Sequence, residues 1–148
     1  MSINPVQLLQ DLVRIASPNP PGDTRAIADF IAEFMEHFGC RVEKLAPPQK
    51  PEARSVVASI GQGDPVIMLH AHIDTVPIAA DEAGKWSVDP YAAVIKDGRL
   101  YGKGSVDDKA PLAAMMQTIL NAAARGNVQG TLVLVAAAEA EVGGQLGT

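Results

Sequence analysis

Apolar residues recur at helical spacing in three segments of the chain. Each segment is bounded by residues that favour helix starts or stops. The predicted helices run from Pro5 to the residues before Ser17, from a cap at Asp23 or Thr24 to Gly39, and from the turn that contains Pro111 to Gly126.

Shorter apolar runs between turn residues predict strands. They cover residues 40–45, 55–60, 93–96, 99–101 and 131–137, and a further strand begins at Val66 and stops at Pro77. The dipeptide Asp97-Gly98 suits a two-residue hairpin turn between two of them. The uninterrupted run 131–137 is typical of a strand covered on both faces, and the run that starts at Val66 is also expected to be buried.

Two helices followed by strands, and a later helix between strands, favour an α/β layer around a partly parallel sheet. The loop from Pro77 to Pro90, which contains Trp86, is longer than about 12 residues and is therefore expected to be functional.

His72 and Asp74 lie two residues apart at the end of the strand that begins at Val66. Side chains two apart on a strand leave the same face, so the carboxylate can orient the histidine ring as a metal ligand. The alternative is a strand terminus with a hydrogen-bonded buried aspartate.

A second acidic cluster, Asp107-Asp108, follows the glycine-flanked segment 102–104 and precedes the third helix. A phosphate-binding loop is excluded because Lys103 precedes the second glycine and a hairpin precedes the motif. Asp108 can be an N-cap, whereas Asp107 lies outside the helix and is the better candidate for a ligand.

A third cluster, Glu139 and Glu141, follows the strand 131–137. His72, Asp107 and Glu141 are thus spaced by 35 and 34 residues, each after a strand or hairpin. Histidine with carboxylates suits zinc better than calcium or magnesium, and a carboxylate can bridge a pair of ions.

The charge and cysteine content narrow the function classes. A formal net charge of −5 argues against binding to nucleic acid. Cys40 is the single cysteine, so no intrachain disulfide can form and a reducing compartment is indicated. The start Met1-Ser2-Ile3 has no basic region or long apolar run, so we expect no signal peptide, no membrane span and a cytoplasmic location.

Five ordered blocks of the chain resemble the di-zinc deacylase and carboxypeptidase family that includes acetylornithine deacetylase, succinyl-diaminopimelate desuccinylase, aminoacylase and glutamate carboxypeptidase. The blocks are Ser17–Gly22, His72–Pro77, Trp86–Tyr91, Leu100–Lys109 and Glu141–Gly144.

The resemblance implies a three-layer α/β/α zinc-exopeptidase-like domain with a mixed, largely parallel sheet. It also implies that His72 binds one zinc, that Asp107 bridges two Zn²⁺ ions (Co²⁺ or Mn²⁺ being possible), that Glu141 binds the other, and that Asp74 serves catalysis by orienting His72. The substrate would be an N-acyl amino acid or a short peptide.

The chain departs from the family pattern in two ways. The family usually has paired glutamates before Val-Gly-Gly, and Ala140 stands at the position of the first, the general base. The family also carries a further acidic ligand, a late histidine and a lid domain used for dimerisation. We therefore expect residues 1–148 to be the N-terminal portion of one catalytic domain, inactivated at Ala140, whose parent is a homodimer through the lid.

Three functions remain open at the level of sequence. The first is a metal-dependent hydrolase of amide bonds, which the intact blocks favour. The second is a non-catalytic relative that binds metal and ligand, which Ala140 favours. A purely structural α/β domain leaves the placement of the acidic clusters unexplained. An aspartic protease is excluded because Val76 occupies the required glycine position and no second copy of the motif exists.

Overall fold

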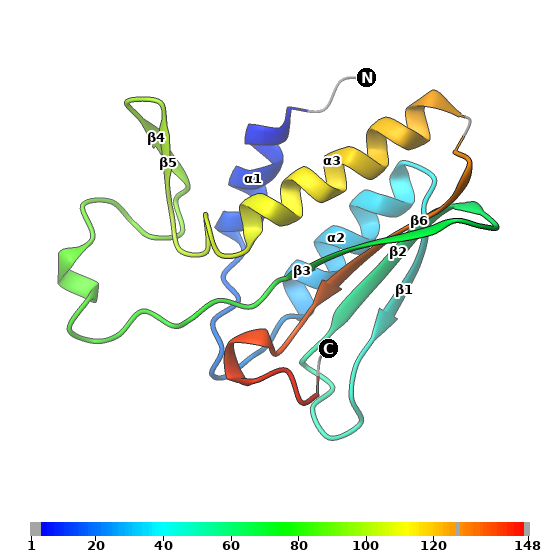
Figure 1. Ribbon diagram of the computed structural model, residues 1–148. Helices are drawn as coiled ribbons and strands as arrows, with labels where there is room; N and C mark the ends of the chain where they lie inside the picture. The colour runs from blue at the N-terminus through cyan, green and yellow to red at the C-terminus, as the bar shows by residue number, and fades with distance from the viewer. Residues whose placement is uncertain (1–3, 127, 147–148) are drawn as a thin grey trace.

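The computed structural model describes residues 4–126 and 128–146 (Figure 1). Met1–Ile3, on which the expectation of no targeting segment rests, lie outside this part. In chain order the elements are α1 (Pro5–Arg14), α2 (Arg25–His37), β1 (Arg41–Leu45), β2 (Ser55–Gln62), β3 (Val66–His72), η1 (Ala83–Lys85), β4 (Val94–Lys96), β5 (Arg99–Tyr101), α3 (Lys109–Arg125), β6 (Gly130–Ala137) and η2 (Ala140–Val142). Every helix and strand predicted from the sequence is present.

Several boundaries follow directly from local chemistry. The Asn4 side chain accepts a hydrogen bond from the backbone N–H of Val6 (2.9 Å), which caps α1, and Pro5 takes the first helical position. The β4–β5 hairpin turns at Asp97 and Gly98, whose φ angles are 52° and 72°. Two positive φ angles match the turn that favours this dipeptide.

Four strands form one sheet in the order β1-β2-β6-β3. β1 pairs with β2 and β2 with β6 in antiparallel fashion, whereas β6 and β3 are parallel. The expected α/β class with a mixed sheet is confirmed. The sheet of this part of the chain is not largely parallel, because β2 joins β6 in the antiparallel sense.

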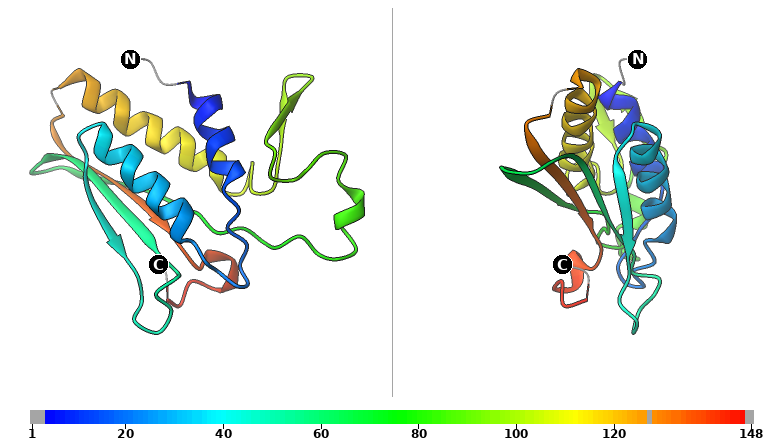
Figure 2. Two further views of the ribbon diagram at one scale, coloured as in Figure 1. Left: turned by 180° about the vertical axis from the view of Figure 1, so that it is seen from behind. Right: turned by 90° about the vertical axis from the view of Figure 1, so that its right-hand side faces the viewer.

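The described helices pack against one face of the sheet (Figure 2). The sheet residues on that face are buried: Val56, Ala58, Ala71, Leu134 and Ala136. They meet α2 and α3, whose inward residues include Ile27, Ile31, Leu112, Met116 and Ile119, each fully buried. Two of the three layers that the family resemblance implies are thus present in the described residues.

The opposite face of the sheet is open, which corrects two expectations about burial. β3 lies at a sheet edge, and its residues Val66, Ile67 and Met68 are 59%, 52% and 62% exposed. β6 is central, but Val133 and Val135 on its open face are only half-buried. An apolar run indicates potential burial, and which faces are covered depends on packing partners distant in sequence.

The sheet brings distant segments of the chain together at the carboxyl ends of β3 and β6. β3 and β6 are parallel, with His72 paired to Ala137, so both strands end at the same place. α3 begins beside them. Its first residue, Lys109, is fully buried, and its ammonium donates to the carbonyl oxygens of Leu12 (3.0 Å) and Ile15 (2.7 Å). This contact ties the start of α3 to the end of α1.

None of the helices in the described part of the chain has the length and apolar character needed to cross a bilayer.

Gly102 leads from β5 towards the third helix and offers a test of the packing. A Cβ atom at this position would lie 2.4 Å from Cγ1 of Val13, a fully buried residue of α1. We expect Gly102→Ala to lower the free energy of unfolding by about 1–3 kcal/mol, since overpacking forces neighbours to shift. Urea denaturation followed by circular dichroism measures the change.

Gly84 provides the matched control, because a Cβ atom there would meet nothing within 4 Å. Gly84→Ala should change the free energy of unfolding by less than about 0.5 kcal/mol. Equal effects of the two substitutions would contradict the close packing of Gly102 on α1.

Candidate metal centre

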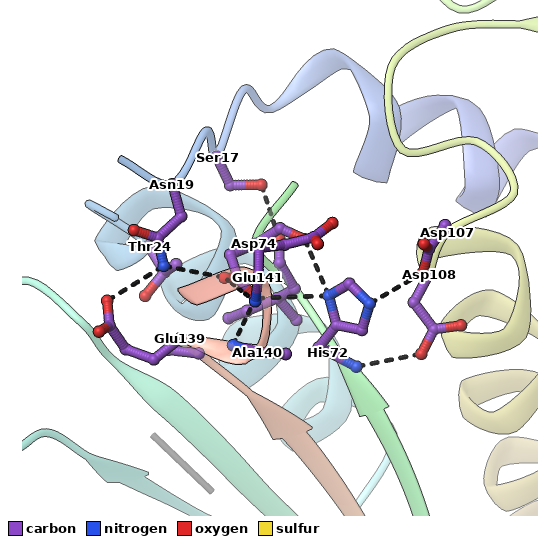
Figure 3. Close-up of polar contacts among 12 residues, drawn as sticks. Ser17, Asn19, Thr24, His72, Asp74, Asp107, Asp108, Glu139, Ala140 and Glu141 are labelled. Carbon is purple, nitrogen blue, oxygen red and sulfur yellow. Dashed lines mark hydrogen bonds and ion pairs between the residues drawn. The ribbon is translucent and has the colours of Figure 1, made fainter. Parts of the chain in front are cut away.

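Three side chains from three separate segments meet at the shared end of β3 and β6 (Figure 3). His72 is the last residue of β3, Asp107 precedes α3, and Glu141 lies in η2 just after β6. Their ligand atoms all lie within 4.8 Å of one another. The structure therefore brings together the three residues that the sequence nominated as metal ligands, hereafter the triad.

The His72 ring is held at both of its nitrogens. Nδ1 lies 2.9 Å from the backbone carbonyl oxygen of Asp74 and 3.3 Å from the Asp74 carboxylate. A carbonyl oxygen can only accept, so Nδ1 carries the proton. Nε2 then points towards Oδ1 of Asp107, at 2.9 Å.

This arrangement requires a positive charge between Nε2 and the carboxylate. In the neutral ring Nε2 has a lone pair, which would face another acceptor. A second proton resolves the conflict: the hydrogen bond to the Asp74 carboxylate, with a smaller contribution from Asp107, raises the pKa of His72 to about 9 although burial opposes it. A metal ion at the same place resolves it equally well, because metal and proton compete for the same lone pair.

Glu141 is also fixed in place. Its Oε1 accepts a hydrogen bond from the backbone N–H of Val76 (3.1 Å), just beyond the end of β3. The side chain of Asp107, by contrast, is 77% exposed and is held by His72 alone among the contacts that the described residues make with it.

Asp74 is fully buried beneath this group. Its carboxylate accepts from Asn19 Nδ2 (2.9 Å) and from the backbone N–H groups of Ala140 (3.2 Å) and Glu141 (3.0 Å). Burial alone would raise the pKa of Asp74, but the hydrogen bonds from His72, Asn19 and the Glu141 N–H outweigh it and lower the pKa. One carboxylate therefore orients the His72 ring and the segment that carries Glu141.

Glu139 is turned away from the triad. It has a left-handed backbone conformation (φ 70°), is 5% exposed, and its Oε1 accepts from Lys50 and from Asn19 Nδ2 (3.2 Å). Figure 3 shows its carboxylate on the far side of Asp74 from His72. Ala140, between the two glutamates, offers only a methyl group.

Sequence reasoning missed Asn19 and Lys50 around the site, and it assigned Asp108 only a capping role. Asn19 belongs to a segment that reads as a rigid proline-rich connector, yet it is 3% exposed and bonds to two carboxylates. Lys50 lies in a polar loop, and no feature of the sequence around it indicated a role at the site. Asp108 occupies the N-cap position of α3 without a side-chain cap bond, and its Oδ2 instead accepts from the backbone N–H of His72 (3.1 Å).

The donor set fits a first-row metal ion. Zinc bonds of about 2.0–2.2 Å at tetrahedral angles place two ligand atoms roughly 3.4 Å apart. The triad atoms lie within 4.8 Å of one another, and imidazole with carboxylates is a typical zinc donor set. The lone pair that Nε2 of the neutral ring would direct at the Asp107 carboxylate is the specific feature that favours a cation here, either a proton or a metal ion.

A family model described as Peptidase family M20/M25/M40 matches residues 68–148. Among curated proteins, the chain is similar to succinyl-diaminopimelate desuccinylase of Methylobacterium radiotolerans, with 34% identity over 117 residues, which are 78% of this chain and 29% of that protein. The same enzyme of Parvibaculum lavamentivorans is 30% identical over 140 residues, 93% of this chain and 34% of the relative. The chain thus spans about a third of the length of these relatives.

Solved structures share the fold. An M20 family metallo-carboxypeptidase from Sulfolobus solfataricus superposes with a TM-score of 0.78 at 20% identity, covering 90% of this chain and 30% of that one. Human carnosine dipeptidase 1 gives a TM-score of 0.74 at 23% identity, covering 89% of this chain and 31% of that one.

We expect the 148-residue chain to bind zinc weakly. The triad supplies one histidine and two carboxylates, whereas closed zinc sites take about four ligands for each ion. Calorimetric titration should show no tight step for two ions. Nanomolar binding of two zinc ions by this chain would contradict the expectation.

The contacts of Asp74 predict an order of effects on zinc affinity. His72→Ala removes a ligand, whereas Asp74→Asn disturbs the groups that orient His72 and Glu141, a loss of typically about 10–100-fold. We expect the histidine substitution to weaken binding more. Titration with zinc at constant pH measures both, and the exposed Asp64→Asn is the matched control. Equal losses for the two variants would indicate that Asp74 is itself a ligand.

Proposed function

Because the chain belongs to peptidase family M20/M25/M40, we propose that it forms part of a metal-dependent hydrolase that cuts amide bonds. The bond would lie in an N-acyl amino acid or at the C-terminal end of a short peptide. Similar proteins named as a desuccinylase, a metallo-carboxypeptidase and a dipeptidase support this class of reaction.

The observation that carries the proposal is the pairing of His72 with Asp107. Nδ1 of His72 donates its proton in a hydrogen bond to Asp74. Nε2 of the same ring lies 2.9 Å from Oδ1 of Asp107. A cation satisfies both groups, and the ligand atom of Glu141 lies within 4.8 Å of those of His72 and Asp107. This geometry is costly without a positive charge and suits a metal centre.

We propose two Zn²⁺ ions, with Asp107 between them, His72 on one and Glu141 on the other. Co²⁺ or Mn²⁺ would suit the same donors. Bound ions would polarise the amide carbonyl and acidify a water molecule. Asp74 acts as a positioning residue, since it sets the ring tautomer of His72 and holds the backbone at Glu141.

Proton transfer to the leaving amine is where this chain differs from the family pattern. Ala140 has no group that can accept or deliver a proton. Glu139 does not replace it, because Lys50 and Asn19 engage its carboxylate away from the triad. We therefore propose that the form with Ala140 turns over very slowly.

The same residue supports a second candidate function, a non-catalytic relative that binds metal and ligand. The triad, Asp74 and its hydrogen bonds do not depend on the side chain at position 140, because Asp74 binds the backbone N–H there. Binding can therefore persist without turnover. The rate gained by restoring a glutamate separates the two candidates.

We further propose that these residues form the N-terminal portion of a single catalytic domain. The coverage of 29% and 34% of two relatives supports a longer parent. This proposal includes additional metal ligands and a lid domain in the longer parent, and a homodimer formed through that lid. It also includes a substrate of the N-acyl amino acid or short peptide class.

Restoring the base tests the proposed function. In a full-length protein that contains this chain, Ala140→Glu should raise the rate of amide hydrolysis by at least about a hundredfold, since a positioned acid/base contributes about 10²–10⁴-fold. Metal content should change little. The measurement is metal analysis together with kinetics on several N-acyl amino acids and dipeptides.

Ala140→Gln is the matched control, because glutamine has the size of glutamate and cannot exchange the proton. It should stay as slow as the form with Ala140. A form with Ala140 that turns over as fast as Ala140→Glu would overturn the assignment of the base, and Glu139 would then be the residue to substitute.

A further inference from the structure

A cavity of about 270 Å³ adjoins the triad. Asp107 and Glu141 line one part of it, and Trp86, Lys103 and Ser105 line another. Trp86 and Lys103 also line a neighbouring hollow together with Lys85. Trp86 comes from the long loop after Pro77, so the loop contributes a flat apolar surface beside the candidate metal centre.

Lys103 differs from the other lysines near the site. Lys50 is paired with Glu139, Lys85 with Asp81 at 3.2 Å, and the ammonium of Lys109 donates to two carbonyl oxygens. In residues 4–126 and 128–146, no ion pair or side-chain hydrogen bond is found for Lys103. Its backbone N–H is already used by the Pro90 carbonyl (2.7 Å), which leaves the ammonium as its free donor.

The segment that carries Lys103 is packed on both sides. Gly102 lies against Val13, and a Cβ atom at Gly104 would lie 2.5 Å from Cγ2 of Thr75. Gly104 also has a φ of 74°, which side chains rarely adopt. Lys103 therefore lies on backbone with little freedom to move, four residues before Asp107 of the triad.

Thr75 provides a second unused donor among the residues that line this cavity. It is 1% exposed, and its hydroxyl has no hydrogen-bond partner in the described part of the chain. A buried hydroxyl without a partner loses free energy relative to water. The cavity thus combines an unpaired cation and an aromatic wall, whereas the hydroxyl oxygen of Thr75 is itself buried.

We propose that Lys103 binds a carboxylate of the substrate, with Trp86 packed against the adjoining methylene groups. Lys103 as a residue is half-buried, and an ammonium forms charge-assisted hydrogen bonds to a carboxylate that are stronger than those between neutral groups. The inference rests on the proposed function for its substrate, an amide. It assigns to Lys103 the recognition of a carboxylate that such an amide carries on its acyl or its amino-acid side.

Trp86 is the sole tryptophan of the chain, so its fluorescence reports directly on this cavity. The metal-free 148-residue chain, kept in EDTA, is titrated with three probes. N-methylsuccinamic acid has its carboxylate on the acyl side, N-acetylglycine has it on the amino-acid side, and N-acetylglycinamide has none. We expect one of the two acids, the one whose carboxylate reaches Lys103, to bind best. The neutral N-acetylglycinamide should bind at least about tenfold more weakly than this acid.

Lys103→Met should weaken binding of the preferred acid by about tenfold or more, and Lys103→Arg should restore most of it because the charge returns. Lys85→Met is the matched control, since Lys85 is exposed and already paired with Asp81. It should leave the affinity unchanged. Circular dichroism verifies that each variant is folded.

Equal binding of the acids and the neutral amide would overturn the inference, as would unchanged binding by Lys103→Met or a loss confined to Lys85→Met. Hydrolysis and metal content are not read in this experiment. A failure here therefore leaves the proposed function standing, and a failure of the Ala140→Glu test leaves the carboxylate site standing.

Discussion

The buried carboxylate of Asp74 is the interaction on which the candidate site depends. It receives hydrogen bonds from a connector near the N-terminus, from the ring at the end of β3 and from two consecutive backbone N–H groups after β6. A carboxylate without solvent must be compensated in this way, and each donor is thereby fixed in turn. The relative positions of His72 and Glu141 follow from their shared contact with Asp74.

Much of the fold is readable from the sequence, because it depends on local chemistry. The cap at Asn4, the turn at Asp97-Gly98 and the apolar stripes of the helices each need only a few neighbouring residues. The order of strands and the coverage of the sheet depend on distant partners. For that reason the apolar run of β3 was predicted to be buried, whereas the structure places it at an open edge.

The same distinction applies to the site. His72, Asp107 and Glu141 were nominated because each follows an apolar strand or a hairpin, and the structure does bring them together. The surrounding contacts were not predictable. Asn19 reaches Asp74 across 55 residues and Lys50 reaches Glu139 across 89, in segments whose composition indicates only a connector and a polar loop. These contacts join segments that are distant in sequence, and no local pattern encodes them.

Asp74 fixes the segment after β6 through its backbone, and this affects how the sequence of the segment can change in evolution. It binds the main chain at residues 140 and 141, so the path of this segment does not depend on which side chain stands at position 140. Any residue with a backbone N–H at position 140 can therefore keep these hydrogen bonds to Asp74. If position 140 carries the general base, as we propose, a substitution there would convert a catalyst into a receptor, or the reverse, while the fold is kept.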